Sequence, residues 1–263
     1  MTDNPKYSRL LEPGKIGPVT TRNRIIKTGA GVMMWHEDDV VMRDEVLAFY
    51  EAMARGGTGL IIVESPTVDY PAGCRWRDRY RLDDDKFIPG MAQIAEVIHK
   101  HGCPTFMQMN HDGTWQAHLS FSPNPPYIGL PYAASEVVVP CETDFHNEVP
   151  HPLTVAEIED IVEKFAKCAE RAKKAGFDGV DINASSSHLL HNFLSPFWNR
   201  RTDEYGGSAE NRARFTCQVV SEIKRLCGKD FPVTVCINGL EAGQLCGIDD
   251  SRCITNETAK EHA

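Results

Sequence analysis

The stretch from Thr154 to Ile182, TVAEIEDIVEKFAKCAERAKKAGFDGVDI, contains one helix followed by one strand. Thr154 with Glu157 three residues later forms a capping box, which predicts that a helix begins here. Apolar residues then recur at helical spacing up to Gly176, and the apolar run Gly179–Ile182 predicts a buried strand. A helix that leads through a glycine into an apolar strand is typical of α/β proteins.

The same pattern extends in both directions from this stretch. Apolar runs predict further strands at 24–27, 59–63, 105–109 and 233–237, with helical patterns at about 43–55, 89–100 and 208–227. Strands that alternate with helices imply a parallel sheet. No G-x-G-x-x-G follows the first strand, which removes the main support for an open dinucleotide-binding sheet. The sequence therefore predicts an α/β fold of the TIM (β/α)8-barrel type, with only about the first five βα units present.

Composition and charge narrow the class of protein. The 263 residues carry 28 Lys and Arg against 37 Asp and Glu, a net charge of −9. This balance argues against nucleic acid as a partner, because a phosphate backbone needs a basic face. No apolar run approaches the roughly 18 residues of a membrane span. The polar N-terminus and nine scattered cysteines indicate a cytoplasmic protein with reduced thiols. We expect one domain over 1–263, with a long active-site loop at 111–152.

Small and polar residues follow the predicted strands, where barrel enzymes hold their catalytic groups. The run Gly29-Ala30-Gly31 would let a flat ring approach the backbone, although a simple turn uses the same residues. Gln108 offers a donor and an acceptor that suit a pyrimidine-like edge or, equally, a neighbouring loop. Asn183 and His188 follow the fourth strand, and a histidine there either exchanges protons near neutral pH or has a structural role.

Metal and acyl-transfer chemistry have little support in the sequence. His111, His188 and His191 lack the H-E-x-x-H or H-x-H spacing of metal sites. Cys246 and Cys253 have no companion pair that would complete a zinc or iron–sulfur site. The serines at 185–187 do not form G-x-S-x-G, so a nucleophile elbow is not expected. We therefore assign no metal site.

Longer motifs allow a comparison with a known family. The block Asn199-Arg-Arg-Thr-Asp-Glu-Tyr-Gly-Gly-Ser208, followed by Glu210-Asn-Arg-Ala-Arg-Phe215, is long and specific. Gly176–Ile182, His188–Pro196 and Gln108–Gly113 add shorter matches. Together they resemble the signature of the Old Yellow Enzyme family of NADH:flavin oxidoreductases, in particular its 2,4-dienoyl-CoA reductase-like branch. The likeness spans nearly the whole chain.

The resemblance implies a flavoprotein with FMN at the C-terminal ends of the barrel strands. NADH or NADPH would reduce the flavin, and the hydride would pass to the C=C bond of an α,β-unsaturated carbonyl compound. An enone, an enoyl-CoA thioester or a steroid-like molecule would fit that class, and the reaction would run as reduction or as desaturation. Because no apolar run is long enough for a membrane span, we expect no membrane partner, and a homo-oligomer stays open.

The family pattern also assigns roles to single residues. The backbone of Gly29, Ala30 and Gly31 would flank the flavin ring, with Ser65 and Gln108 at its pyrimidine side. The catalytic set would be Asn183 and Ser186, at the positions of the carbonyl-binding pair, and His188, at the position of the proton-donating tyrosine. Cys236 stands where the family has an arginine beside flavin N1 and O2, and Gly31 replaces the Thr or Cys that tunes the flavin potential.

The resemblance also implies that the chain is truncated at its C-terminus. Relatives continue with further strands, whose loops hold the FMN phosphate, and the tail after Gly239 predicts no strand. A catalytically silent truncated barrel that acts as a binding remnant is therefore an alternative from a different class. A metal-dependent barrel hydrolase is a third interpretation.

Overall fold

The computed structural model describes residues 7–32, 34, 41–74, 80–114, 131–138, 149–241 and 250–263. Its centre is a five-stranded sheet whose strands follow one another in chain order: β3 (Ile26–Lys27), β4 (Leu60–Val63), β5 (Thr105–Met109), β8 (Gly179–Ala184) and β9 (Val233–Ile237). Every neighbouring pair in this sheet is parallel. The five predicted strands are confirmed, and their order is that of successive βα units in a barrel.

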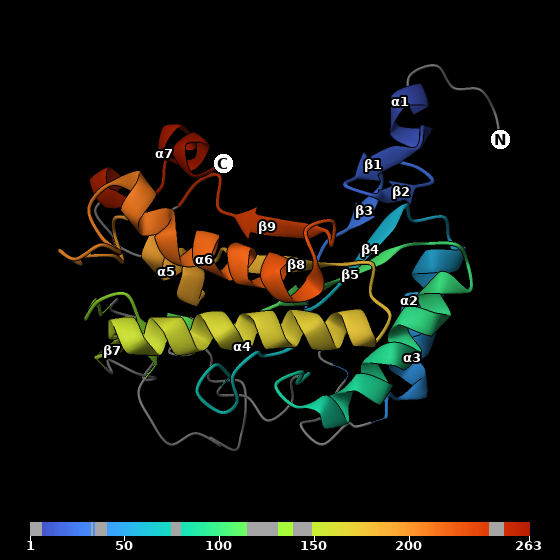
Figure 1. The fold of residues 1–263 in the computed structure, drawn as a ribbon. Helices are drawn as coiled ribbons and strands as arrows, with labels where there is room; N and C mark the ends of the chain where they lie inside the picture. Colours follow the sequence, from blue (N-terminus) through green and yellow to red (C-terminus); the bar gives the residue numbers. More distant parts are fainter. Residues whose placement is uncertain are drawn as a thin grey trace.

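One face of the sheet is covered by the helices that connect the strands. They are α2 (Asp44–Arg55), α3 (Ile88–His99), α4 (Val155–Lys174) and α6 (Ala209–Cys227). Figure 1 shows α4 and α6 crossing this face side by side. Their apolar faces pack on Val63, Met107 and Ile182 of the strands, all of which are fully buried. Because parallel strands need crossover connections, a helix separates each strand from the next.

Local signals set where these helices begin. Thr154 Oγ1 accepts from Glu157 N at 3.3 Å, and the Glu157 carboxylate accepts from Thr154 N at 2.7 Å, so the predicted capping box is present. Ser208 Oγ accepts from Asn211 N at 3.2 Å at the start of α6. Pro89 lies in the first turn of α3, where its missing N–H costs nothing.

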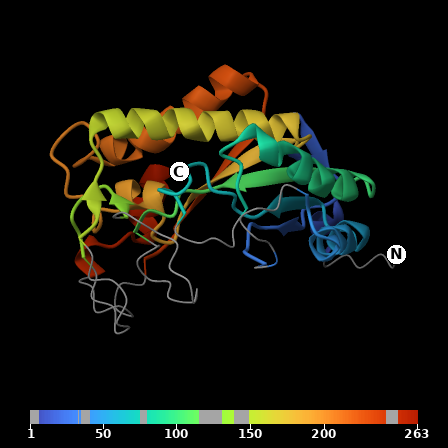
Figure 2. The same ribbon diagram turned by 90° about the horizontal axis from the view of Figure 1, so that it is seen from below.

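Shorter elements lie at the two ends of the sheet. Helix α1 (Ser8–Leu11) and the hairpin β1 (Gly14–Ile16) and β2 (Val19–Thr21) lie at the N-terminal ends of the strands, whereas α5 (Leu189–Leu194), η5 (Asp250–Arg252) and α7 (Asn256–His262) lie at the C-terminal ends (Figure 1). Figure 2, seen from below, shows α4 running along the sheet with the N-terminal elements at one end. None of the described helices has the length and apolar composition needed to cross a membrane.

The segment predicted as a long loop contains a small sheet. Strand β6 (Tyr132–Ala133) pairs in parallel with β7 (His151–Pro152). Outside this loop, the one-turn helix η2 (Asp85–Phe87) directly precedes α3. Residues 115–130 and 139–148 of that loop lie outside the described residues. Its role as an active-site loop therefore stays a prediction.

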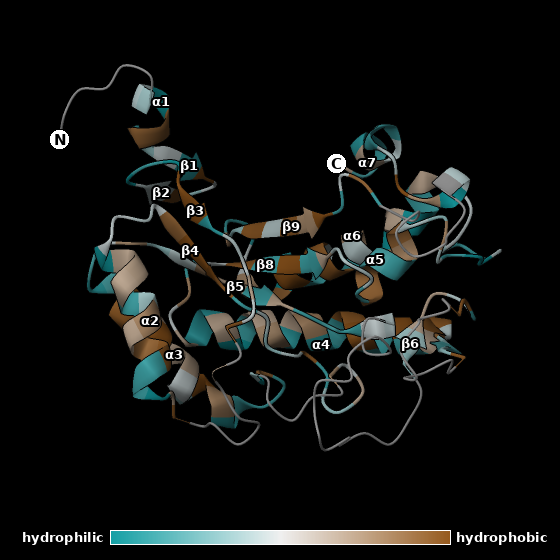
Figure 3. Cartoon of the chain, turned by 180° about the vertical axis from the view of Figure 1, so that it is seen from behind, coloured by the Kyte–Doolittle hydropathy of each residue, from teal (hydrophilic) through white to brown (hydrophobic). Residues whose placement is uncertain are grey.

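The other face of the sheet becomes polar toward the C-terminal ends of the strands. Figure 3 views this face, which no described helix crosses. The strand register places Gln108 opposite Asp181, and Asp181 opposite Thr234. The next row that points to the same face pairs Asn183 with Cys236. Near the N-terminal ends the same face is apolar, where the β1–β2 hairpin packs on it.

Candidate active site

Gln108 lies on β5 and is only 6% exposed. Its Nε2 donates to Asp181 Oδ2 at 2.7 Å, and its Oε1 accepts from Ser65 Oγ at 2.7 Å. An ionised carboxylate accepts hydrogen bonds and donates none, so Asp181 fixes the orientation of the Gln108 amide. The structure thus brings together Gln108 and Ser65, the two residues predicted for the pyrimidine side of a flavin.

Asp181 is a site residue that the sequence analysis did not identify. Its Oδ1 accepts from Thr234 Oγ1 at 2.6 Å, and its Oδ2 accepts from Gln108. Burial raises the pKa of the Asp181 carboxyl, and the two hydrogen bonds offset part of that rise. The available signal was an acidic residue inside an apolar strand, since such residues are rarely buried without partners.

The backbone at Gly29 contacts the Gln108 side chain directly. A Cβ on Gly29 would lie within 2.5 Å of the Gln108 Cδ atom, so a larger residue here would displace the amide. Ala30 and Gly31 continue the segment and are exposed. The predicted run 29–31 therefore lies beside Gln108 as an accessible stretch of backbone.

Buried Glu64 anchors the end of this segment. Its Oε1 accepts from Val32 N at 3.2 Å, while its Oε2 accepts from the Tyr50 hydroxyl and lies 3.5 Å from Lys27 Nζ. The side chains of Glu64 and Lys27 are 1% and 15% exposed. Burial raises the pKa of Glu64 and lowers that of Lys27, and their mutual attraction opposes both shifts. The sequence analysis assigned no role to this pair, because the contact joins two strands that are far apart in the sequence.

Asn183 lies on β8 with a defined amide orientation. Its Oδ1 accepts from Ser185 N at 3.2 Å and from Ser185 Oγ at 2.8 Å. A backbone N–H can only donate, so the amide oxygen must face Ser185 and the Nδ2 group must face the other way. Across the residues described, Asn183 Nδ2 has no hydrogen-bond partner, and it is therefore the available donor at this strand end.

His188 is the last residue before α5 and is 7% exposed. Its Nδ1 lies 2.7 Å from the carbonyl oxygen of Ser185. A carbonyl oxygen only accepts, so Nδ1 carries the hydrogen and proton exchange falls to Nε2. The imidazole is thus held at Nδ1 by the loop that precedes it.

Ser186 and Cys236 are both neighbours of Ser185, the first in the sequence and the second from β9. Ser186 is exposed, and its backbone N–H donates to Asn238 Oδ1 at 3.0 Å. Cys236 is also exposed, and its thiol donates to Ser185 Oγ at 3.6 Å. The strand register pairs Cys236 with Asn183, two residues further along the strands than the pair of Asp181 and Thr234.

The three histidines weighed for a metal have other partners. His111 is fully buried and its Nδ1 accepts from Gly113 N at 3.3 Å, while His191 Nδ1 accepts from Ser187 N at 3.1 Å. Burial lowers the pKa of His111 to about 3. Within the described ranges, no group of three or more His, Cys, Asp or Glu could hold a metal ion. Cys246 lies outside those ranges.

Comparison with known proteins shows which family the chain belongs to. Residues 9–242 match the NADH:flavin oxidoreductase / NADH oxidase family. The chain belongs to this family. The resemblance to Old Yellow Enzymes and the expected TIM-barrel type are confirmed, with the five-stranded parallel sheet as one part of a barrel. FMN is the flavin of the family, and NADH or NADPH is its hydride donor.

Individual relatives show how much of the family's length this chain spans. It is 39% identical over 228 residues to an NADH oxidase of Thermoanaerobacter brockii, and 34% identical over 218 residues to an NADPH dehydrogenase of Bacillus subtilis. These matches cover 87% and 83% of this chain, and 34% and 60% of the two relatives. An Old Yellow Enzyme homologue from Zymomonas mobilis has a similar structure, with a TM-score of 0.74 and 29% identity over 87% of this chain and 62% of that one.

The strand ends of this family member fit the ring of FMN in part. The exposed backbone at 29–31 leaves room for a flat ring, and Gln108 and Ser65 offer both donors and acceptors for its pyrimidine edge. The charge match is weaker, because Cys236 adds no positive charge at its position and Asp181 adds an acid to the same face. The site therefore suits a neutral ring better than an anionic one.

Proposed function

We propose that this chain forms the flavin-facing part of an oxidoreductase that moves hydride between NADH or NADPH, FMN and the C=C bond of an α,β-unsaturated carbonyl compound. The observation that carries the proposal is the pair of groups at the end of β8. Asn183, near the C-terminal end of β8, presents an available N–H donor, and His188, on the loop that follows, has Nε2 as its proton-exchanging nitrogen. A donor and an acid beside a flavin-type site are what reduction of a polarised alkene requires.

Each residue has a defined part in this scheme. The backbone at 29–31, Ser65 and Gln108 would hold the ring of FMN, which when bound supplies the hydride chemistry. Asn183 Nδ2 donates to the substrate carbonyl oxygen and stabilises the negative charge that develops there. Ser186 adds its exposed hydroxyl on the same loop. His188 Nε2 gives a proton to the α-carbon, while the hydrogen bond from Nδ1 to Ser185 keeps the ring in place.

The substrate class rests partly on a named relative. The chain is 34% identical over 247 residues to a cinnamate reductase of Clostridium sporogenes. Cinnamate carries a C=C bond conjugated to a carboxyl group, which belongs to the class that Asn183 and His188 would serve. We therefore favour conjugated acids, their CoA thioesters and enones, including steroid-like ones, as the compounds to test.

Titration of FMN into the purified chain tests the cofactor part of the proposal. We expect weak but saturable quenching of flavin fluorescence, because the resemblance places the loops that hold the FMN phosphate on further strands of the relatives. We expect Gln108→Ala to weaken this binding about fivefold, since it removes one hydrogen-bonding side chain. Gln93→Ala is a matched control, because Gln93 lies on α3 and bonds Met42 N on the helical side. No quenching with the unsubstituted chain would contradict the proposal and favour a silent binding remnant.

Activity of the loaded protein tests the reaction. Anaerobic mixing with NADH or NADPH should bleach the bound flavin, and cinnamate or a cyclic enone should then restore its colour. Bleaching without recovery on any conjugated carbonyl would keep the flavin assignment and overturn the substrate class.

A further inference from the structure

Two consecutive serines between Asn183 and His188 adopt a backbone conformation that ordinary residues avoid. Ser186 has φ 52° and Ser187 has φ 62°, both in the left-handed region. Such residues persist only where their surroundings hold them. Ser185, the residue before this pair, bonds both the Asn183 amide and His188 Nδ1, so the groups that hold the pair also affect how these two side chains are oriented.

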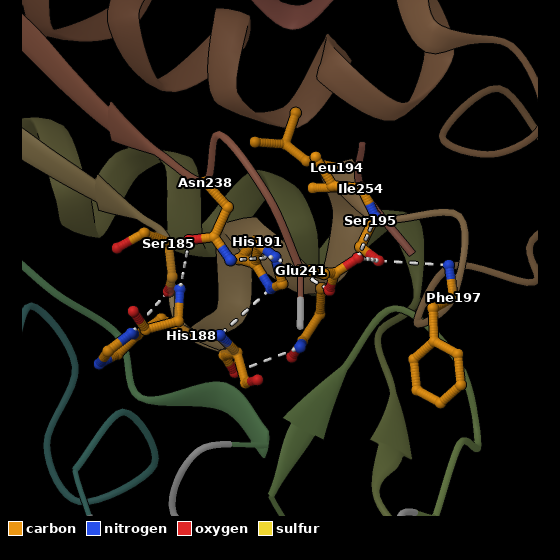
Figure 4. A network of polar contacts seen from close by, with 12 residues as sticks. Ser185, His188, His191, Leu194, Ser195, Phe197, Asn238, Glu241 and Ile254 are labelled. Carbon is orange, nitrogen blue, oxygen red and sulfur yellow. Dashed lines mark hydrogen bonds and ion pairs between the residues drawn. The ribbon is translucent and has the colours of Figure 1, made fainter. Parts of the chain in front are cut away.

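Two side chains accept the N–H groups of these serines. Asn238 Oδ1, just after β9, accepts from Ser186 N at 3.0 Å. His191 Nδ1, on α5, accepts from Ser187 N at 3.1 Å. Figure 4 shows both acceptors on one side of the loop, facing each other. The turn is thus held from two elements that are far apart in the sequence.

The bond from Ser187 fixes the tautomer of His191. Because a backbone N–H donates to Nδ1, that nitrogen carries no hydrogen, and the hydrogen must be on Nε2. Nε2 lies 3.1 Å from Glu241 Oε1 and donates to it. Asn238 Nδ2 is 3.2 Å from the same nitrogen and, as another donor, makes a contact there and no hydrogen bond.

Both carboxylate oxygens of Glu241 have hydrogen-bond partners. Its side chain is 9% exposed, and its Oε2 accepts from Ser195 Oγ at 2.8 Å and from Ile254 N at 2.6 Å. Burial alone would raise the pKa of Glu241, but its interactions with His191, Ile254 and Ser195 outweigh this effect and lower the pKa. The carboxylate therefore stays ionised as an acceptor, tied to α5 and to the segment before α7 (Figure 4).

We infer that His191 and Glu241 are positioning residues, which hold the Ser186–Ser187 turn and thereby, through Ser185, orient the side chains of Asn183 and His188. The link runs from the Glu241 carboxylate through His191 to the Ser187 N–H. For its effect on reaction the inference rests on the proposed function, whereas for its effect on the turn it stands on the geometry alone.

Hydrogen exchange of the Ser187 amide tests the inference without any flavin. We expect Glu241→Ala and His191→Phe each to speed exchange at Ser187 by about tenfold or more, since each removes a hydrogen bond that holds the turn. Glu257→Ala is the matched control, because its side chain is 82% exposed on α7 and pairs only with Lys260 among the described residues. Unchanged exchange at Ser187 in both test variants would overturn the inference.

A second variant guards against loss of the fold. Asn238→Ala removes the acceptor of Ser186 and the contact of Nδ2 with His191, at a partly exposed position, and leaves the bond from Ser187 to His191 in place. Relative to the unsubstituted chain, we expect Asn238→Ala to speed exchange at the Ser186 amide and to leave exchange at the β8 amides unchanged. In a separate measurement, we expect nitrogen-15 spectra of the unsubstituted chain to show His191 with its hydrogen on Nε2. A hydrogen on His191 Nδ1 would contradict the link to Ser187.

Kinetics of the loaded protein test the consequence for reaction. Glu241→Gln should lower the turnover of alkene reduction about tenfold or more. It should leave FMN affinity and flavin reduction by NADH or NADPH unchanged. Glu241→Asp should have part of the original turnover, because it keeps the carboxylate. Equal loss in both half-reactions would overturn the positioning role. If the unsubstituted protein reduces no alkene, the proposed function fails and the exchange experiment still decides the role of His191 and Glu241.

Discussion

At the residue scale, the amide side chains of the site are oriented by neighbours that can act only as hydrogen-bond donors or only as acceptors. Asp181 accepts from Gln108 and so selects its Nε2, while the Ser185 N–H selects Oδ1 of Asn183. The orientation of each amide is thereby defined before any ligand arrives. Donors that are already oriented need no reorganisation when charge develops on a substrate, which is why such groups contribute strongly to catalysis.

The orientation of Asn183 leads to a prediction for turnover. Asn183→Asp keeps the size of the side chain but replaces the N–H donor by oxygen, so alkene reduction should fall by about 10²-fold. FMN affinity should hold, because Gln108 and Ser65 are untouched. Ser221→Ala on α6, far from the strand ends, serves as the control. Turnover of Asn183→Asp within a factor of about two of the original would remove this residue from the mechanism.

The hydrogen bond at His188 Nδ1 leads to a prediction for pH dependence. Nε2 can donate a proton only in the imidazolium form, whose fraction falls as the pH rises through the pKa. Alkene reduction should therefore decline on the alkaline side, and His188→Phe should remove that limb. His188→Tyr should move the limb toward the higher pKa of a phenol, about 10. Stopped-flow measurement of the two half-reactions gives the test, and a pH limb that persists in His188→Phe would assign the proton to another group.

At the element scale, strand register decides which residues meet. Gln108, Asp181 and Thr234 come from three strands and lie in one row because β5, β8 and β9 are parallel and in register. The periodicity and caps in the sequence were sufficient to predict these strands and the helices between them. The predicted cofactor residues on different strands could be expected to converge, because C-terminal ends of parallel strands share one edge.

Other features depended on contacts that the sequence does not display. Helix α5 and the β1–β2 hairpin are too short to show a reliable period, so neither was predicted. Glu64 and Asp181 follow the strand pattern, and only their partners, Lys27 and Gln108, show that they are built into the site. The left-handed turn at Ser186 and Ser187 likewise depends on His191 and Asn238, which no local rule connects to it.

The buried pair of Lys27 and Glu64 leads to a prediction for stability. Lys27→Met leaves the Glu64 carboxyl without its cation, so the free energy of unfolding should drop by about 3 kcal/mol. Burial already raises the pKa of Glu64, so the folded chain takes up this proton more readily than the unfolded chain, and the loss should shrink as the pH falls. Urea unfolding at neutral and mildly acidic pH measures both effects.

Two control variants separate this effect from a general loss of charge. Adding Glu64→Gln to Lys27→Met should recover much of the stability, because no charge then remains buried. Lys260→Met should change little, since Lys260 is 71% exposed and pairs with Glu257 on the surface. A pH-independent loss in Lys27→Met would show that packing, and not the buried charge, is responsible.

At the scale of the whole molecule, the described chain is a five-stranded parallel sheet with its connecting helices on one face. Among the described residues, β3 and β9 each pair with one neighbour only, so each leaves a row of backbone groups open. Apolar side chains at these edges are accessible, with Ile26 44% and Val235 37% exposed. Open edges with apolar residues favour pairing between chains.

This arrangement predicts that the purified chain associates as its concentration rises, and that the β9 edge takes part. Val235→Glu places a charge on that edge and should shift the weight-average mass toward the monomer in sedimentation velocity. Val155→Glu is the matched control, because Val155 is also 37% exposed but lies at the start of α4. The two variants change the net charge equally, so any difference between them reports the location and not the charge. Equal effects of both substitutions would mean that general repulsion, rather than edge pairing, governs the association.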